Sequence, residues 1–411
     1  MTIETTSTLT NSIRAQYIDT YLAGVKRMRL YDQVAVPYTN FSGGLSQSDL
    51  MRGSSVVLPF VSGMAPGTAA ISETADVNPQ VLKDATATIT PTSRGEVLQW
   101  SEKLDMQVYT DYDRQRVNAL SENMTETVEA LAIDVALAGT WLERDASTRA
   151  GLDAGSSGDR CSDANFRMVD GLMQSLLVPG YVGDDGQANT WLAIMHPWLF
   201  HDIQEGGNVD SIGLYQDKGI HLNWELGKLG NFRLVSSAFA KVFMCAGAAN
   251  GTTDVGSDTV NGAISRLGKT VVTTNNNSTA ATAGTGKLWM VGTIETGNTF
   301  HPTNEFFKPL SASTYTITVA AQGPNGGWKY DHASGATVDN SDSVFPILFA
   351  GPQSLVKIYA TDIGEYGQLL DPKETGMLNQ WTSQGWKFYG NYGLISQSRL
   401  VRGEYTVSYQ A

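Results

Sequence analysis

The stretch that decides the fold is QGWKFYGNYGLISQSRLVRGEYTVSYQA, residues 384–411. In its first half, aromatic side chains fall on one side of a period-two pattern, at Trp386, Phe388 and Tyr392. This alternation predicts a β-strand. Residues 400–409 alternate in the same way and predict a second strand. We interpret the two strands as a closing hairpin that ties this end of the chain into a packed fold.

Length and composition indicate a globular protein with a sizeable core. The chain has 411 residues, of which 41% are hydrophobic, and this is enough for two or three lobes. No apolar run approaches the roughly 18 residues of a membrane-spanning helix. The start, MTIETTSTLTNSIRAQ, lacks the basic and apolar segments of an export signal, so we expect no export. Cys161 and Cys245 are too few for a disulfide framework or a metal cluster.

The chain is acidic, with 41 acidic and 28 basic residues and a net charge of −13. This balance argues against a dedicated nucleic-acid binder, whose affinity depends on clustered Lys and Arg. It is compatible with a container wall that surrounds DNA without adhering to it. It is equally compatible with a charge that serves only solubility.

The first hundred residues indicate an extended arm followed by a β-ribbon. Apolar residues at helical spacing between Ser12 and Leu30 predict one short amphipathic helix within the arm. Residues 55–60, 85–92 and 95–104 predict strands. A ribbon with so little core of its own needs another surface to lie on.

Residues 111–142 predict the longest helix of the chain. A continuous apolar stripe runs along it, and roughly 30 residues would form a rod of about 45 Å. Its polar residues predict a back face turned away from a sheet; they are Arg114, Arg116, Glu122, Glu126 and Glu129. Residues 163–178 predict a second helix. Trp191–Met195 then predicts a buried strand, followed by a turn at His196-Pro197.

Two segments predict surface insertions. Residues 246–286 and 322–342 are rich in Gly, Asn, Thr and Ser and show no hydrophobic periodicity, so we expect neither to carry a core. Strands resume at 288–294 and 314–320, and residues 345–359 again resemble core sequence.

No constellation of residues predicts chemistry. Gly284–Lys287 departs from a phosphate-binding loop because Leu288 replaces the Ser or Thr that would hold magnesium. His196 and His201 are five residues apart, one more than the spacing of neighbouring helical ligands. Asp254 and Asp258 lack the glutamate of a calcium loop. We predict no catalytic residue, no cofactor and no metal site, although an acidic chain always leaves a glycosidase carboxylate pair open.

Several short motifs occur in a distinctive order. They are Gly53–Pro59, Ile71–Glu73, Trp191–Pro197 with Asp202-Ile203 after it, Gly227–Val235, Asp371-Pro372 and Gln384–Lys387. Together with the order of elements, they resemble the major capsid protein of tailed bacteriophages, the Johnson or Hong Kong ninety-seven fold. The motifs are most similar to those of podoviruses related to the coliphage N-four group. The two insertions have no counterpart in this pattern.

The resemblance implies an α+β, Hong Kong ninety-seven-like fold in five parts. They are an N-terminal arm with a short helix (1–52), an E-loop β-ribbon (53–108), a P-domain (109–200) with spine helix 111–142 and second helix 163–178, an A-domain with insertions (201–380), and C-terminal strands that return to the P-domain (381–411). The expected packing anchors are Leu131, Trp191 and Trp386.

The resemblance also implies a function without catalysis. The chain would assemble with its own copies into pentamers and hexamers of an icosahedral virion shell, after synthesis in the host bacterial cytoplasm. The shell would enclose double-stranded DNA without specific binding, with no membrane, and would meet scaffold, decoration and portal proteins. The expected intersubunit contacts are Ile13, Tyr17, Tyr21, Val56, Phe60, Ile71 and Glu73.

Two alternatives remain open at this point. An encapsulin-type nanocompartment shell would share the fold, although the Gly-Trp-Lys motif and the insertions favour a phage protein. A secreted carbohydrate-active β-protein could use the nine tryptophans to line a sugar cleft. That second reading requires export.

Overall fold

A computed structural model describes residues 30–38, 55–61, 63–64, 66–67, 79–107, 112–182, 188–205, 210–211, 225–249, 258–266, 271–273, 288–299, 301–313, 316–319, 328–360, 363, 365, 367–376 and 380–410. The predicted arm helix before Leu30 and the turn Ile71–Glu73 lie outside these residues. The chain forms two compact units, one made of residues 1–131 and 355–395 and the other of residues 132–354 and 396–411. The five-part division remains a prediction.

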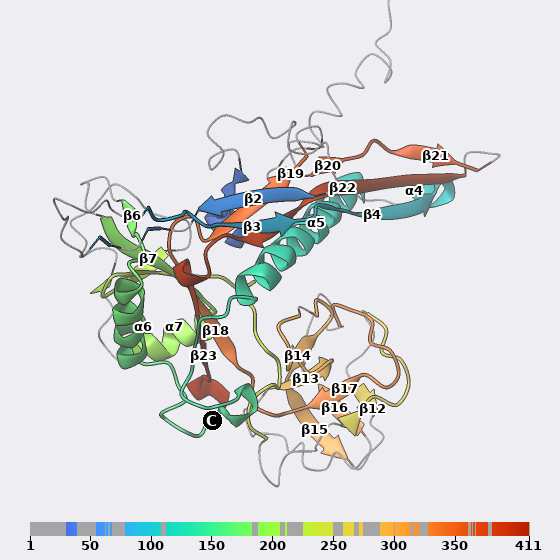
Figure 1. Ribbon diagram of the computed structural model, residues 1–411. Coiled ribbons are helices and arrows are strands. Elements are labelled where there is room, and N and C mark those ends of the chain that lie inside the picture. Colours follow the sequence, from blue (N-terminus) through green and yellow to red (C-terminus); the bar gives the residue numbers. More distant parts are fainter. Residues whose placement is uncertain are drawn as a thin grey trace, which may run out of the picture. The chain divides into compact units, whose positions relative to one another are not determined.

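A six-stranded sheet organises the first unit (Figure 1). Its order is β1 (Val36–Pro37), β19 (Leu355–Tyr359), β22 (Trp381–Leu394) and β20 (Gln368–Leu369), and β21 (Lys373–Thr375) and β4 (Thr92–Ser101) also pair with β22. Strand β4 runs antiparallel to β22 from Ser101 opposite Trp381 to Thr92 opposite Gly390. The aromatic alternation of β22 is confirmed, because Trp386, Phe388 and Tyr392 are buried.

The long helix is α5 (Tyr112–Leu137), which ends five residues before the predicted boundary. The indole Nε1 of Trp386 donates to Asn123 Oδ1 at 3.0 Å, which fixes the helix on β22. The predicted polar back face is wrong at two positions, since Arg116 and Glu129 are buried. Both side chains have polar partners that the pattern could not reveal, as described below.

The ribbon consists of β2 (Val56–Val61) and β3 (Asp84–Ile89), paired antiparallel. One face of it is buried in a cluster with Tyr38, Val356 and Ile358. The strands predicted at 55–60 and 85–92 are therefore confirmed. The third predicted strand ends earlier than expected, because residues 102–107 form helix α4 (Glu102–Gln107).

An eight-stranded sheet organises the second unit. Its order is β5 (Leu142–Glu143), β23 (Leu400–Tyr405), β18 (Phe345–Ala350), β7 (Ala188–Met195), β10 (Phe232–Ser236), β9 (Glu225–Leu229) and β8 (Asp210–Ser211), and β6 (Tyr181–Val182) pairs with β7. Every residue of β18 and β23 is buried, as in strands covered on both faces. The core includes Phe166, Phe232 and Phe349 in edge-to-face contact.

Two helices of this unit lie before and after β7 in the chain. Helix α6 (Asp163–Ser175) starts with a capping box between Ser162 and Asn165. Helix α7 (Pro197–Glu205) replaces the turn that we predicted after His196. The prediction was wrong because proline is also well suited to the first position of a helix. Among the described residues, we find no helix with the length and apolar character needed to cross a membrane.

The second unit also contains two small sheets. One has the order β11 (Asp258–Thr259), β17 (Thr337–Asp339), β13 (Trp289–Gly292) and β14 (Glu305–Phe307), and the other has the order β12 (Val271–Thr273), β16 (Thr316–Val319) and β15 (Pro309–Ser313). Val260, Ile264, Trp328 and Val338 are buried in their common cluster. The prediction that the two insertions carry no core is thus wrong. Within these segments β17 supplies only Val338 to the cluster and β11 supplies none, which is too few for a periodic signal.

The predicted closing hairpin is also wrong. Strand β22 pairs with β19 and β4, whereas β23 pairs with β18 and β5 in the other sheet. The 3₁₀ helix Gln397–Arg399 lies between the two strands in sequence. Residues 395–399 lack the two-residue turn signal of a tight hairpin, and this sequence feature is consistent with strands that separate.

Candidate functional site

The first unit exposes apolar side chains along its ribbon. While Val56 and Leu58 point into the core, Val57 and Val61 point outward, with Val61 65% exposed. Val81, next to β3, is 85% exposed. Single exposed apolar residues are normal, whereas large exposed apolar patches are typical of interaction surfaces. We call these residues, with Met64 and Leu82, the ribbon surface.

A second group of exposed apolar residues lies on β4, α4 and the start of β22. Its members are Val97, Leu98, Leu104, Met106 and Trp381. Both faces of β4 are exposed from Thr92 to Gln99. We call this group the sheet-end surface. It is a second place where the described residues of this unit expose apolar area.

Polar contacts hold the sheet-end surface in position. Trp100 Nε1 donates to Asp105 Oδ2 at 2.7 Å, and the guanidinium of Arg116 pairs with the same carboxylate. The guanidinium carbon lies 4.0 Å from the centre of the Trp100 ring, a cation–π contact. These contacts fix α4 against the first turns of α5. They also explain why Arg116 is buried despite its charge.

Glu129 is the most unusual group of the first unit, since it is 1% exposed in the middle of α5. Its Oε1 accepts the backbone N–H of Leu30 at 2.8 Å and that of Tyr31 at 2.6 Å, and its Oε2 accepts that of Asp32 at 3.4 Å. Burial raises the pKa of Glu129 to about 7, although the N–H donors act in the opposite direction. Burial and the nearby Glu129 charge also raise the pKa of Tyr31.

In the second unit, a cluster of arginines surrounds the fully buried Glu404. Arg149 and Arg402 bind Glu404 Oε1 at 2.6 and 3.0 Å, and Arg144 binds Oε2 at 3.1 Å. Arg402 also donates to the carbonyl of Leu137, and Asn298 Nδ2 donates to it at 3.1 Å. These donors satisfy a terminal carbonyl of α5 that the helix itself leaves without a partner.

Lys241 and Glu295 form a second buried ion pair, at 2.7 Å. Burial raises the pKa of Glu295 and lowers the pKa of Lys241. Glu295 also accepts the N–H of His301 at 3.2 Å and the Nδ2 amide of Asn304 at 3.2 Å. The pair therefore joins separate loops of this unit, and its polar atoms are engaged with protein groups.

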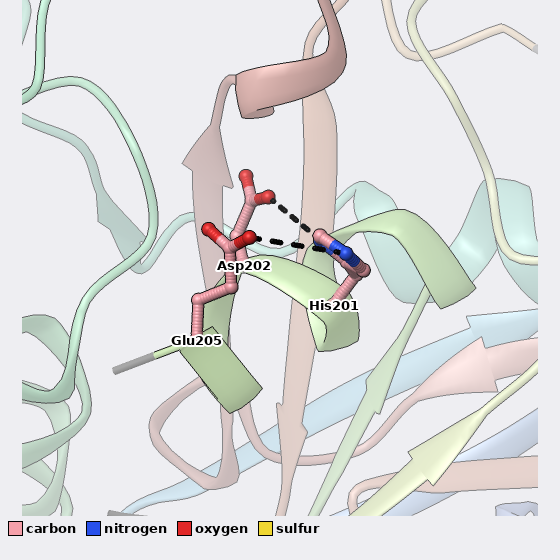
Figure 2. Close-up of side chains that lie close together, drawn as sticks. All are labelled: His201, Asp202 and Glu205. Atoms are coloured by element: carbon pink, nitrogen blue, oxygen red, sulfur yellow. Dashed lines mark ion pairs between the residues drawn. The ribbon is translucent and has the colours of Figure 1, made fainter. Parts of the chain in front are cut away.

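One cluster of potential metal ligands lies on α7, at His201, Asp202 and Glu205 (Figure 2). His201 and Glu205 are 66% and 67% exposed at their side chains, and their closest approach is 4.0 Å. Asp202 accepts the backbone N–H of Ser408 at 2.7 Å and its hydroxyl at 2.5 Å. Asp202 thus holds the end of the described chain, and the other two groups are ordinary exposed side chains of one helix.

The sequence-predicted residues fall in different environments. Trp191 and Trp386 are buried in the two sheets, whereas Leu131 is half-buried. Val56 is buried inside its own subunit and leaves almost no surface for a neighbour. Ile13, Tyr17, Tyr21, Ile71, Glu73 and the side chain of Phe60 lie outside the described residues.

Sequence reasoning missed both buried carboxylate sites. The partners of Glu129 lie 97 or more residues away in sequence. Arg144 and Arg149 lie 255 or more residues from Glu404, whereas Arg402 is close to it in sequence. The exposed residues of the ribbon were also missed, although the alternation of Val56, Val57 and Leu58 could have separated the two faces.

The fold resembles solved phage capsid structures. The capsid of Ralstonia phage GP4 is 10% identical and aligns over 93% of this chain and 92% of that chain, with a TM-score of 0.55. The capsid structure of Cyanophage P-SCSP1u is 11% identical, with 92% and 88% covered and a TM-score of 0.46. No protein-family model and no curated protein matches the sequence.

The first of these similarities is sufficient to define the fold. The chain has a mixed α+β fold of the Hong Kong ninety-seven type, which phage capsid structures share over most of its length. The predicted fold class is therefore confirmed.

Proposed function

We propose that this chain is the major capsid protein of a tailed double-stranded DNA bacteriophage. Its copies assemble as pentamers and hexamers into an icosahedral virion shell and perform no catalysis. The observation that carries this proposal is the fold shared with the Ralstonia phage GP4 capsid over nearly the whole of both chains. Function inferred from fold is an analogy, so it needs support from surfaces of this chain.

The apolar surfaces of the first unit provide that support. The ribbon surface and the sheet-end surface expose valines, methionines, leucines and a tryptophan. A stable interface between subunits needs about 800 Å² from each partner. Two apolar groups on one unit are suited to contact more than one neighbour, as a closed shell requires.

The acidic charge also agrees with a shell that encloses DNA without binding it. A net charge of −13 opposes strong phosphate binding. We further propose that the virus is a podovirus related to the coliphage N-four group. We also propose that the shell binds scaffold, decoration and portal proteins. The order of short sequence motifs supports the subgroup.

The contacts between copies are proposed at the arm and the ribbon. They include Ile13, Tyr17 and Tyr21 of the arm, and Phe60, Ile71 and Glu73 of the ribbon. Because the side chain of Val56 is buried, we propose its exposed neighbour Val57 as the contact that β2 makes with another copy.

Negative-stain microscopy of the expressed full chain tests this function. Uniform closed particles, or rings of five or six copies, are the expected result. Mass per particle from charge-detection mass spectrometry then gives the copy number. A chain that remains monomeric at high concentration, in several salts and with the arm intact, would refute the proposal.

A further inference from the structure

Residues 30–38, which we call the arm root, are held in place by one buried carboxyl group. Glu129 accepts three consecutive backbone N–H groups, those of Leu30, Tyr31 and Asp32. The first turn of helix α2 (Tyr31–Val34) therefore depends on Glu129 for hydrogen bonds that the helix itself cannot supply.

The arm root makes three other kinds of contact: apolar packing, pairing of β1 with a neighbouring strand, and polar contacts with other charged groups. Leu30, Tyr31, Val34, Ala35 and Tyr38 are buried, and β1 pairs with β19.

Titratable and charged groups surround the site from three elements. Asp32 of α2 accepts the hydroxyl of Tyr392 on β22 at 2.5 Å, and Lys357 on β19 binds both Asp32 and Glu365. Glu129 is thus bordered by a carboxylate–lysine–tyrosine network. Among the described residues, the hydrogen bonds that Glu129 accepts come from backbone amides. The charged group that shifts the pKa of Glu129 is Asp32, which raises it.

We propose that Glu129 makes the arm root a proton-linked joint, in which docking of residues 30–38 on α5 takes up one proton from the solvent. Docked, the carboxyl group is covered, and burial favours its neutral form. Undocked, it faces water and releases the proton. The inference concerns the single subunit and holds whether or not the proposed shell forms.

The direction of the linkage follows from burial. The covered Glu129 has a pKa of about 7, against 4.5 for an ordinary glutamate, with burial as the largest cause. A carboxyl group whose pKa is raised by docking favours the docked state at low pH and loses this contribution as pH rises through about 7. With these pKa values for the docked and undocked states, the equilibrium constant for docking is roughly tenfold to a hundredfold larger at pH 5 than at pH 8.

Hydrogen–deuterium exchange of the full chain tests this joint. Wild type is compared with Glu129→Gln, which keeps a carbonyl acceptor and the shape of the side chain but cannot release a proton. Glu126→Gln, three positions earlier on the same helix, is the matched control. For residues 30–38, the measured quantity is the ratio of the protection in wild type to the protection in Glu129→Gln. Intrinsic exchange depends on pH equally in both proteins, so its pH dependence cancels in this ratio.

We expect this ratio to fall by about tenfold to a hundredfold between pH 5 and pH 8. The control should behave like wild type, so the ratio of Glu126→Gln to Glu129→Gln should fall by the same factor. A ratio that stays flat overturns the proposal. If residues 30–38 never exchange faster than the amides of β22, opening is global and the local joint is again refuted. Should Glu129→Gln fail to fold, the comparison of residues 30–38 with the β22 amides in wild type alone still decides between local and global opening.

Discussion

Two fully buried carboxylates, Glu129 and Glu404, are held in opposite ways. Glu404 is surrounded by three guanidinium groups from Arg144, Arg149 and Arg402. Among the described residues, Glu129 accepts hydrogen bonds only from backbone amides. Amides supply hydrogen bonds without a full charge, so they offset only part of the cost of burying an anion. The comparison suggests that the partner decides whether a buried carboxylate is a permanent tie or a titratable one.

Replacement of Glu404 is expected to have the largest effect. Glu404→Gln leaves three guanidinium groups without their counter-ion in a buried site, and removal of one partner from such a cluster costs about 3–5 kcal/mol. We expect an equivalent loss in the free energy of unfolding, measured by urea denaturation. Arg144→Gln is the matched control, because Arg144 is the most exposed of the three arginines. Equal losses for both variants would show that the cluster does not act through charge compensation.

Trp386→Ala tests a packing anchor that involves no charge. The indole is 1% exposed and donates to Asn123. Truncation of such a core residue costs about 3–5 kcal/mol, and we expect this loss with no dependence on pH between 5 and 8. Trp386→Phe, which keeps most of the ring, should lose about half of that or less. Thermal unfolding at two pH values provides the measurement, and a fully stable alanine variant would contradict the anchoring role.

The pH dependence of stability sharpens the contrast at Glu129. Its pKa is raised from 4.5 to about 7 in the folded chain, so its contribution to stability is complete below pH 4.5 and is lost as pH rises through 7. Between pH 5 and pH 8 the expected loss is about 2–3 kcal/mol. Urea denaturation at these pH values should show a smaller decline for Glu129→Gln than for wild type. Parallel declines would assign the pH dependence to other groups.

The extent to which the sequence predicts this structure differs between regions for physical reasons. The alternation in β22 and the presence of the long helix α5 arise from local periodicity, and both were predicted correctly. Strand β23 is buried on both faces, so its sequence does not say which strand it pairs with, and the hairpin was a wrong prediction. Glu129 was missed because the amides that hold it are remote in sequence, and Glu404 was missed because two of its three arginines, Arg144 and Arg149, are remote as well.

The smallest effect on stability is expected at the ribbon surface, where the effect on assembly should be largest. Val81 is almost fully exposed, so Val81→Asp should change the free energy of unfolding by no more than about 0.5 kcal/mol. A charge in an apolar interface is costly, because desolvation without a partner is unfavourable. Closed particles should therefore become rare in Val81→Asp and remain frequent in Val81→Thr, which keeps the shape of the side chain. Normal shells from the aspartate variant would remove Val81 from the interface.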